Sequence, residues 1–255
     1  MVTALDQEAF EAALRAGAPV ENADLSDIDW TDLPDGRLVV RHSTIRNAVI
    51  DDAPLEGAVF EHCTFLRCSF PVSRLSQARF IQCSFYDPDG RQGCTFSGTE
   101  LDHATFDHCN LTMSRFPRAD LHAASFIACK APGSDFEDAD FSRRAGRNSV
   151  ALVTFSECIL DMASFRGAML DQCNLEGSSL TQADFTRASL KEANLQRADL
   201  SEAIVQGAEF ERADLREANL TGFKLLDLKS RSGIKLSESS LKGLMAPLGI
   251  RVFPG

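Results

Sequence analysis

A-V-F-E-H-C-T-F-L-R-C-S-F, residues 58–70, contains a five-residue repeat in which a small residue stands two positions before each Phe. The pattern runs through most of the 255-residue chain, with central residues at every fifth position over 25–85, 96–141 and 155–225. Of these 38 central residues, 31 are Phe or Leu. A repeat this regular predicts one elongated solenoid of stacked coils.

Strand geometry explains the five-residue period. In extended backbone, residues two apart point to the same side, so the small residue and the Phe or Leu both face inward. The next alternate position is usually polar or glycine, as at Gly57 and Gly98, so the chain must turn there. Each pentad therefore forms one short side of a coil, and coils stacked at about 4.8 Å can pair their backbones.

The cysteine spacing predicts the number of sides. Cys63 and Cys83 are 20 residues apart, as are Cys109 and Cys129, which gives four pentads per turn if cysteine stacks on cysteine. Two longer steps, of 26 and 29 residues, exceed a turn by 6 and 9 residues, the lengths of the breaks at 88–93 and 144–152. We therefore expect an all-β, quadrilateral β-helix with two loops protruding at corners.

Both ends of the solenoid are expected to be covered. Residues 1–20 should form a helical cap, because 3–16 have amphipathic helical spacing and Gly17 can end the helix. Such a cap would cover the strand edges of the first coil in a β-helix domain spanning 21–225. Residues 226–255 are expected to form a C-terminal cap and helical dimerisation tail, in which the apolar residues predict a dimer interface: Leu241, Leu244, Met245, Leu248 and Ile250.

The eight cysteines occupy positions where other repeats place Ala or Ser. We interpret them as buried, reduced packing residues and expect no metal site or disulfide. The sequence contains no catalytic motif, and its repeated outward carboxylates form no isolated acid–base pair, so we expect neither an enzyme nor a cofactor. Without a secretory signal or long apolar span, the chain is predicted to be cytoplasmic and not membrane-bound.

The net charge of −11 is unevenly distributed. The repeats and the N-terminal cap together carry −16, the second break carries +2 and the tail carries +3. An acidic shaft would repel nucleic acid and could attract a basic groove in a protein partner. Acidic surfaces are also commonly just solvated faces, so the charge alone leaves both interpretations open.

The tandem A-[DN]-[LF]-x-x pattern resembles the pentapeptide repeat family, which implies a right-handed quadrilateral β-helix. The segment F-I-Q-C-S-F-Y-D-P-D-G-R-Q-G-C-T-F-S, residues 80–97, resembles the first-loop region of the quinolone-resistance (Qnr) proteins. The break after Phe141 falls where those proteins carry a second loop, and S-L-K-G-L-M-A-P-L-G-I, residues 240–250, resembles their dimerising tail.

The resemblance implies a homodimer that binds DNA gyrase or topoisomerase IV as a DNA-mimicking acidic rod and protects the enzyme from quinolones or another topoisomerase poison. The alternative is a non-catalytic interaction scaffold or effector with a different partner. The loops are expected to contact the partner, although they could also be tolerated insertions. The expected contact residues are Tyr86, Asp87, Asp89, Arg91 and Gln92 in the first loop, and Arg144, Arg147, Asn148 and Leu152 in the second.

Overall fold

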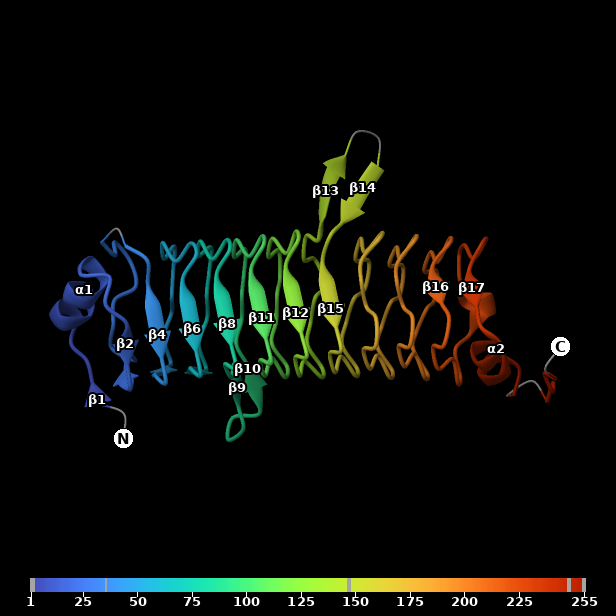
Figure 1. Cartoon of the computed structure of the whole chain (residues 1–255), viewed down its shortest axis with the longest axis horizontal. Coiled ribbons are helices and arrows are strands. Elements are labelled where there is room, and N and C mark those ends of the chain that lie inside the picture. The colour runs from blue at the N-terminus through green and yellow to red at the C-terminus, as the bar shows by residue number, and fades with distance from the viewer. Residues whose placement is uncertain (1–2, 35, 146–147, 247–248, 254–255) are drawn as a thin grey trace.

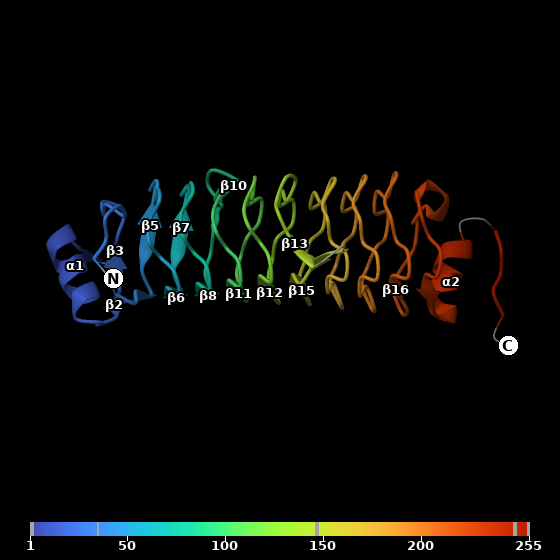
Figure 2. The same ribbon diagram turned by 90° about the horizontal axis from the view of Figure 1, so that it is seen from above.

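The chain is a rod of stacked coils with a helix at each end (Figure 1). The computed structural model describes residues 3–34, 36–145, 148–246 and 249–253, with the backbone only for 144–145 and 148–150. Viewed from above, the rod keeps a similar width along its length (Figure 2). No helix in this described part is long and apolar enough to cross a membrane.

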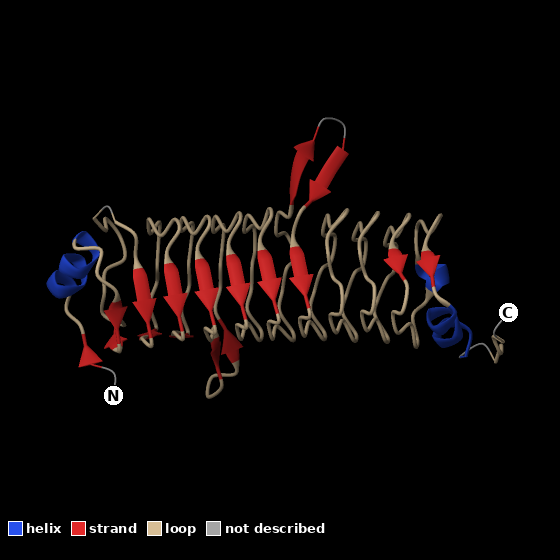
Figure 3. Cartoon of the chain, viewed as in Figure 1, coloured by secondary structure: helices blue, strands red, loops and turns tan. Residues whose placement is uncertain are grey.

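Short strands separated by turns form the sides of the coils, as Figure 3 shows. The helical elements are α1 (Gln7–Arg15), the 3-10 helix η1 (Leu225–Asp227) and α2 (Glu238–Met245). The strands are β1 (Thr3–Ala4), β2 (Val20–Glu21), β3 (Ala23–Asp24), β4 (Val39–Arg41), β5 (Thr44–Arg46), β6 (Val59–Glu61), β7 (Thr64–Leu66), β8 (Arg79–Ile81), β9 (Tyr86–Asp87), β10 (Gln92–Gly93), β11 (Thr105–Asp107), β12 (Ser125–Ile127), β13 (Ser142–Ala145), β14 (Asn148–Ala151), β15 (Thr154–Ser156), β16 (Asp214–Leu215) and β17 (Lys235–Leu236).

Parallel pairing between coils confirms the predicted four-sided β-solenoid. Val40 pairs with Phe60 and Phe60 with Phe80, each exactly one 20-residue turn further along the chain. Across the two breaks, Phe80 pairs with Phe106 and Phe126 with Phe155. Followed through the described residues, this column of side chains has eleven members: Val20, Val40, Phe60, Phe80, Phe106, Phe126, Phe155, Leu175, Leu195, Leu215 and Leu236.

The solenoid is longer than the repeat spacing predicted. The 38 pentads correspond to about 9.5 coils, but the pairing starts at β2 and continues to β17, beyond residue 225. Leu215 and Leu236 are one coil apart although 21 residues separate them. The additional residue lies in the irregular turn that contains η1, so the coil continues where the sequence period is lost.

Phenylalanine rings form the centre of the rod. Along one column, successive rings stack nearly parallel, with centroids 5.2 Å apart for Phe60 and Phe80 and 4.8 Å apart for Phe80 and Phe106. Rings on adjacent sides meet edge-on, as Phe80 and Phe85 do at 5.3 Å. Both arrangements are favourable for aromatic quadrupoles, so stacked coils gain ring contacts in addition to buried area.

The cysteines are free and buried, as predicted. Seven of the eight thiols donate to carbonyl oxygens of the preceding coil, as Cys83 Sγ does to Phe60 O at 3.3 Å and Cys129 Sγ to Phe106 O at 3.2 Å. Ser134 Oγ makes the same contact with Leu111 O at 2.8 Å, which explains why Cys and Ser share this repeat position. Burial also raises the pKa of the Cys173 thiol well above its ordinary value.

The helical N-terminal cap is also confirmed. Asp6 begins α1 by accepting a hydrogen bond from the Ala9 N–H, and the residue Gly17 follows the helix with a φ of +63°. Phe10 is fully buried against Trp30, with ring centroids 5.4 Å apart. The helix therefore covers the first coil with apolar side chains. β1 pairs in parallel with β3 and so covers the exposed backbone edge of that strand.

Native cysteines should react slowly with a thiol reagent, because the side chains are buried and only the thiolate is the reactive form. All eight should react rapidly after unfolding in denaturant, which provides the control. We would measure labelling by the absorbance of the released thiol product. Fast labelling of most cysteines in the folded protein would contradict this packing.

Candidate functional site

Both breaks in the repeat form antiparallel hairpins that project from the rod. β9 pairs with β10, and β13 pairs with β14, whereas the coils pair in parallel. The repeat frame places the breaks two corners apart in a four-cornered coil, and Figure 1 shows the hairpins on opposite sides of the rod. Both hairpins project beyond the sides of the shaft, so we treat them as the candidate contact elements.

The first hairpin presents only part of the residue set predicted from the sequence. Asp89, Arg91 and Gln92 are exposed, and Tyr86 is half-buried. Asp87 is only 3% exposed, which corrects the expectation that its carboxylate is available to a partner. Its backbone pairs with Gln92 at the base of the hairpin, so the residue belongs to the interior of this element.

Asp87 is surrounded by groups that fix the hairpin. Its Oδ1 accepts a hydrogen bond from the Asp89 N–H at 3.1 Å, and its Oδ2 lies 3.5 Å from Arg67 Nη1. Arg67 also donates from Nε to Asn47 Oδ1 at 2.8 Å. Asn47, Arg67 and Asp87 thus follow one another at 20-residue intervals in three successive coils, and Arg67 links the other two.

The second hairpin has two consecutive arginines near its start, Arg143 and Arg144. Arg143, which was not among the predicted contacts, forms ion pairs with Asp120 and with Asp140. Hydrogen bonding to Asp120 raises the pKa of the Arg143 guanidinium. These pairs hold the start of the hairpin against the neighbouring coil.

Three of the four predicted contacts in this hairpin lie in the described part of the chain. Arg144 lies in β13 and Asn148 in β14, where the backbones of Arg144 and Ser149 pair. Leu152 follows β14 and is 57% exposed. Arg147 lies outside the described residues, and the partner-binding role of all these residues stays a prediction.

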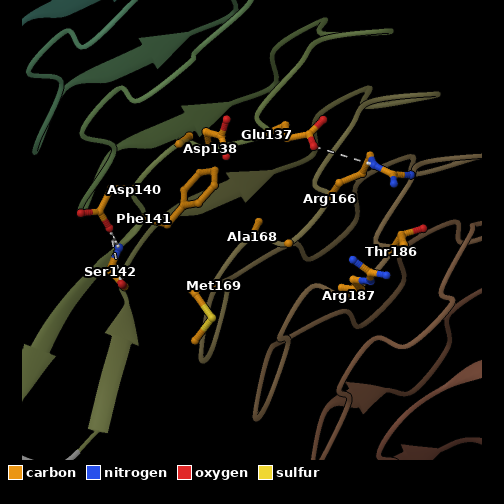
Figure 4. A pocket seen from close by; sticks show the side chains of 12 residues that line it. Glu137, Asp138, Asp140, Phe141, Ser142, Arg166, Ala168, Met169, Thr186 and Arg187 are labelled. Atoms are coloured by element: carbon orange, nitrogen blue, oxygen red, sulfur yellow. Dashed lines mark hydrogen bonds and ion pairs between the residues drawn. The ribbon is translucent and has the colours of Figure 1, made fainter.

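A shallow notch of about 380 Å³ lies on the shaft beside the second hairpin (Figure 4). Gly167 has no side chain to fill it, and it separates Asp138 from Arg187 along the notch. Arg166 contacts Glu137 at 4.0 Å and Asp184 at 2.8 Å, so charges at the rim are partly neutralised. An open notch with these paired groups could accept a partner side chain, but it is no enclosed pocket for chemistry.

Many shaft carboxylates are ion-paired to the neighbouring coil. Arg41 lies between Glu21 and Glu61, with Nη1–Oε1 and Nε–Oε2 distances of 3.2 and 2.6 Å. Further along, Glu209 contacts both Lys191 and Lys229, and these contacts lower the Glu209 pKa. The negative charge of the rod is therefore locally reduced along such ladders.

The C-terminal tail uses part of its apolar surface within the chain. Leu244 of α2 is 7% exposed and belongs to the core, and Met245 packs partly against it. Leu241 is half-buried and Ile250 is 52% exposed, while Leu248 lies outside the described residues. Phe253, which the sequence did not suggest, is 77% exposed. A dimer interface at these residues stays a prediction.

Comparison with protein families supports the repeat assignment. A family model described as pentapeptide repeats matches eight copies, covering residues 92–122, 119–143, 152–187 and 193–225. Together with the four-sided solenoid, this match shows that the chain belongs to the pentapeptide repeat family. A search of curated protein sequences finds no match.

Among solved structures, the chain is similar to QnrB1, described as a plasmid-mediated fluoroquinolone resistance protein. Full-length QnrB1 is 28% identical, with a TM-score of 0.76, and the similarity covers 81% of this chain and 97% of that chain. A trypsin-treated QnrB1 variant is 27% identical, with a TM-score of 0.77, covering 83% of this chain and 99% of that chain. The likeness therefore extends over nearly the whole of QnrB1.

The second hairpin should be removable with little effect on stability. Ala151 N–H donates to Asp171 O at 2.9 Å, the type of bond that Gln172 N–H makes to Lys191 O in an uninterrupted coil. Excising 144–152 joins Arg143 to Val153, so Arg143 N–H can take over this bond. We expect the free energy of unfolding to change by less than about 1 kcal/mol.

Thermal and denaturant unfolding of the excised and parent proteins would test this expectation. Excising eight residues, 144–151, is the matched control, because it leaves the chain one residue out of phase and should destabilise the protein. Equal stability of the two shortened proteins would show that the repeat phase is not what preserves the coil.

Proposed function

We propose that this protein binds a bacterial type II topoisomerase, DNA gyrase or topoisomerase IV, and protects it from quinolones or another topoisomerase poison. The observation that carries the proposal is the similarity to QnrB1 over 97% of that protein's length, with a TM-score of 0.76. Repeat similarity alone would support only the fold. Similarity to a fluoroquinolone resistance protein over almost its entire length also supports a role in quinolone resistance.

The shape and charge of the rod suit contact with a protein that binds DNA. The repeats and the N-terminal cap together carry −16, which the second break and the tail reduce to the net charge of −11. We infer that the shaft occupies a basic DNA-binding groove as a DNA mimic, without binding nucleic acid itself. The ion-pair ladders leave a weaker field than that of B-DNA, which has about one charge per 1.7 Å. Specific contacts by the hairpins would then add affinity that the charge alone does not provide.

The packing supports a non-catalytic mechanism. The inward residues of the repeats are buried phenylalanines, leucines and small side chains, so the described core has no space for a substrate. Protection would consist of binding to the topoisomerase and displacing or destabilising its drug-bound DNA complex. The protein would act through surfaces on the shaft and hairpins.

Purified protein should allow gyrase to supercoil DNA at ciprofloxacin concentrations that otherwise inhibit it. Excising 144–152 should raise the concentration needed for half-maximal protection by about thirtyfold, since loss of an interface hot spot costs about 2 kcal/mol. Supercoiling without the drug controls for direct effects on gyrase. Absence of protection by the parent protein would refute the function, and full protection by the excised protein would assign contact to the shaft.

We also propose a homodimer joined through the C-terminal tails, with Ile250 and Phe253 contributing exposed apolar surface. Ile250→Asp combined with Phe253→Asp should give a folded monomer, because neither side chain is buried in its own chain. Leu226→Asp is a matched control, since Leu226 is also exposed, at 84%, but lies before α2. Sedimentation would measure the assembly state, and a monomeric parent protein at micromolar concentration would refute the dimer.

A further inference from the structure

The first hairpin contains a buried carboxylate that the proposed contact surface does not use. The Asp87 side chain is 4% exposed, and its Oδ2 makes no hydrogen bond among the described residues. Burial of a carboxylate is unfavourable unless nearby groups compensate it. Its compensation here comes from the Arg67 guanidinium at 3.5 Å and from the Asp89 N–H.

The hairpin backbone is shaped closely around this carboxylate. A Cβ on Gly90 would lie 2.7 Å from Asp87 Oδ2, so a larger residue there would have to displace the Asp87 carboxylate. A Cβ on Gly93 would lie 2.4 Å from the backbone of Met113 and Ser114, which belongs to the next coil. The turn is thus packed against Asp87, while the returning strand rests on the neighbouring coil.

These contacts distinguish the hairpin from a loop that merely bridges a gap. A two-stranded hairpin is marginally stable by itself, and β9 and β10 have only two residues each. Nevertheless, Asp89, Arg91 and Gln92 remain exposed beyond the buried base. These three side chains can therefore keep one arrangement only if the contacts at the base of the hairpin, those of Asp87 and Gly93, hold its backbone in place.

We propose that Asp87 and Arg67 are positioning residues, which hold the β9–β10 hairpin in one orientation so that Asp89, Arg91 and Gln92 meet the partner already ordered. The partner contact rests on the proposed topoisomerase protection, whereas the ordering of the hairpin does not. An ordered element binds more tightly than a flexible one, because less conformational entropy is lost on association. Loss of the clamp should weaken binding without removing any contacting side chain.

Limited trypsin digestion tests the ordering directly, since Arg91 lies within the hairpin. Asp87→Ala should accelerate cleavage after Arg91 by about tenfold to a hundredfold, because hydrogen bonds to charged groups strongly limit local opening. Arg67→Met should also accelerate it, while Arg67→Lys retains the positive charge and should restore most of the resistance. Mass spectrometry would quantify this one cleavage, and unchanged cleavage in Asp87→Ala would overturn the proposal.

Asp52→Asn is the matched control. Asp52 lies near an arginine as Asp87 does, with its Oδ1 4.0 Å from Arg74 Nε, but its side chain is 76% exposed. Losing this exposed pair should leave cleavage after Arg91 unchanged. Melting curves of all variants would show whether the solenoid itself remains folded. An equal acceleration in Asp52→Asn would attribute the effect to lost charge and overturn the specific role of Asp87.

The supercoiling assay tests the link to the partner. Asp87→Ala and Arg67→Met should each raise the half-protecting concentration by about tenfold, with the same maximum protection at high concentration. Unchanged half-protecting concentrations with faster cleavage would show that the ordered hairpin does not serve this contact, and would overturn that part of the proposal. If the parent protein gives no protection, the proposed function and its partner contact fail together, while the trypsin rates still decide the ordering.

Discussion

Backbone pairing between successive coils is the constraint on which the rest of this structure depends. It sets one residue directly over the equivalent residue of the preceding turn, so like side chains meet at the spacing of paired strands. Phe106 and Phe126 consequently stack with centroids 4.9 Å apart. The same register lets a cysteine thiol or a serine hydroxyl donate to a backbone carbonyl of the neighbouring coil. Pairing sets a 20-residue register, and dividing that turn among four sides gives the five-residue sequence period.

The corners carry the conformational cost of closing so small a coil. Gln182 and Arg187 have φ values of 58° and 61°, in the left-handed region that costs a residue with a Cβ about 1 kcal/mol. Their N–H groups donate to Ser201 O and Gln206 O of the next coil at 2.9 and 3.0 Å. Pairing thus offsets the strain, and corner side chains can vary in size and charge without altering the fold.

The repeat made the fold and the location of both hairpins predictable, because each depends on spacing. The burial of Asp87 was harder to predict, since the repeat supplies no template inside an insertion. Arg67 nevertheless precedes Asp87 by one 20-residue turn, so the period could have identified this pair. Leu244 was assigned to a dimer interface because its pattern is apolar. Only its position over the last coil shows that the chain itself covers it.

The placement of the hairpins on opposite sides of the rod limits the form of any partner that touches both. A single flat surface could reach only one of them, so the other would need a wall across a deep channel or a separate subunit. The coils between the two hairpins are joined by continuous backbone pairing. Binding of one hairpin would therefore hold the other at a fixed position relative to the partner. The second contact would then form at high effective concentration, and the two hairpin contacts would together act as one bivalent binding interaction.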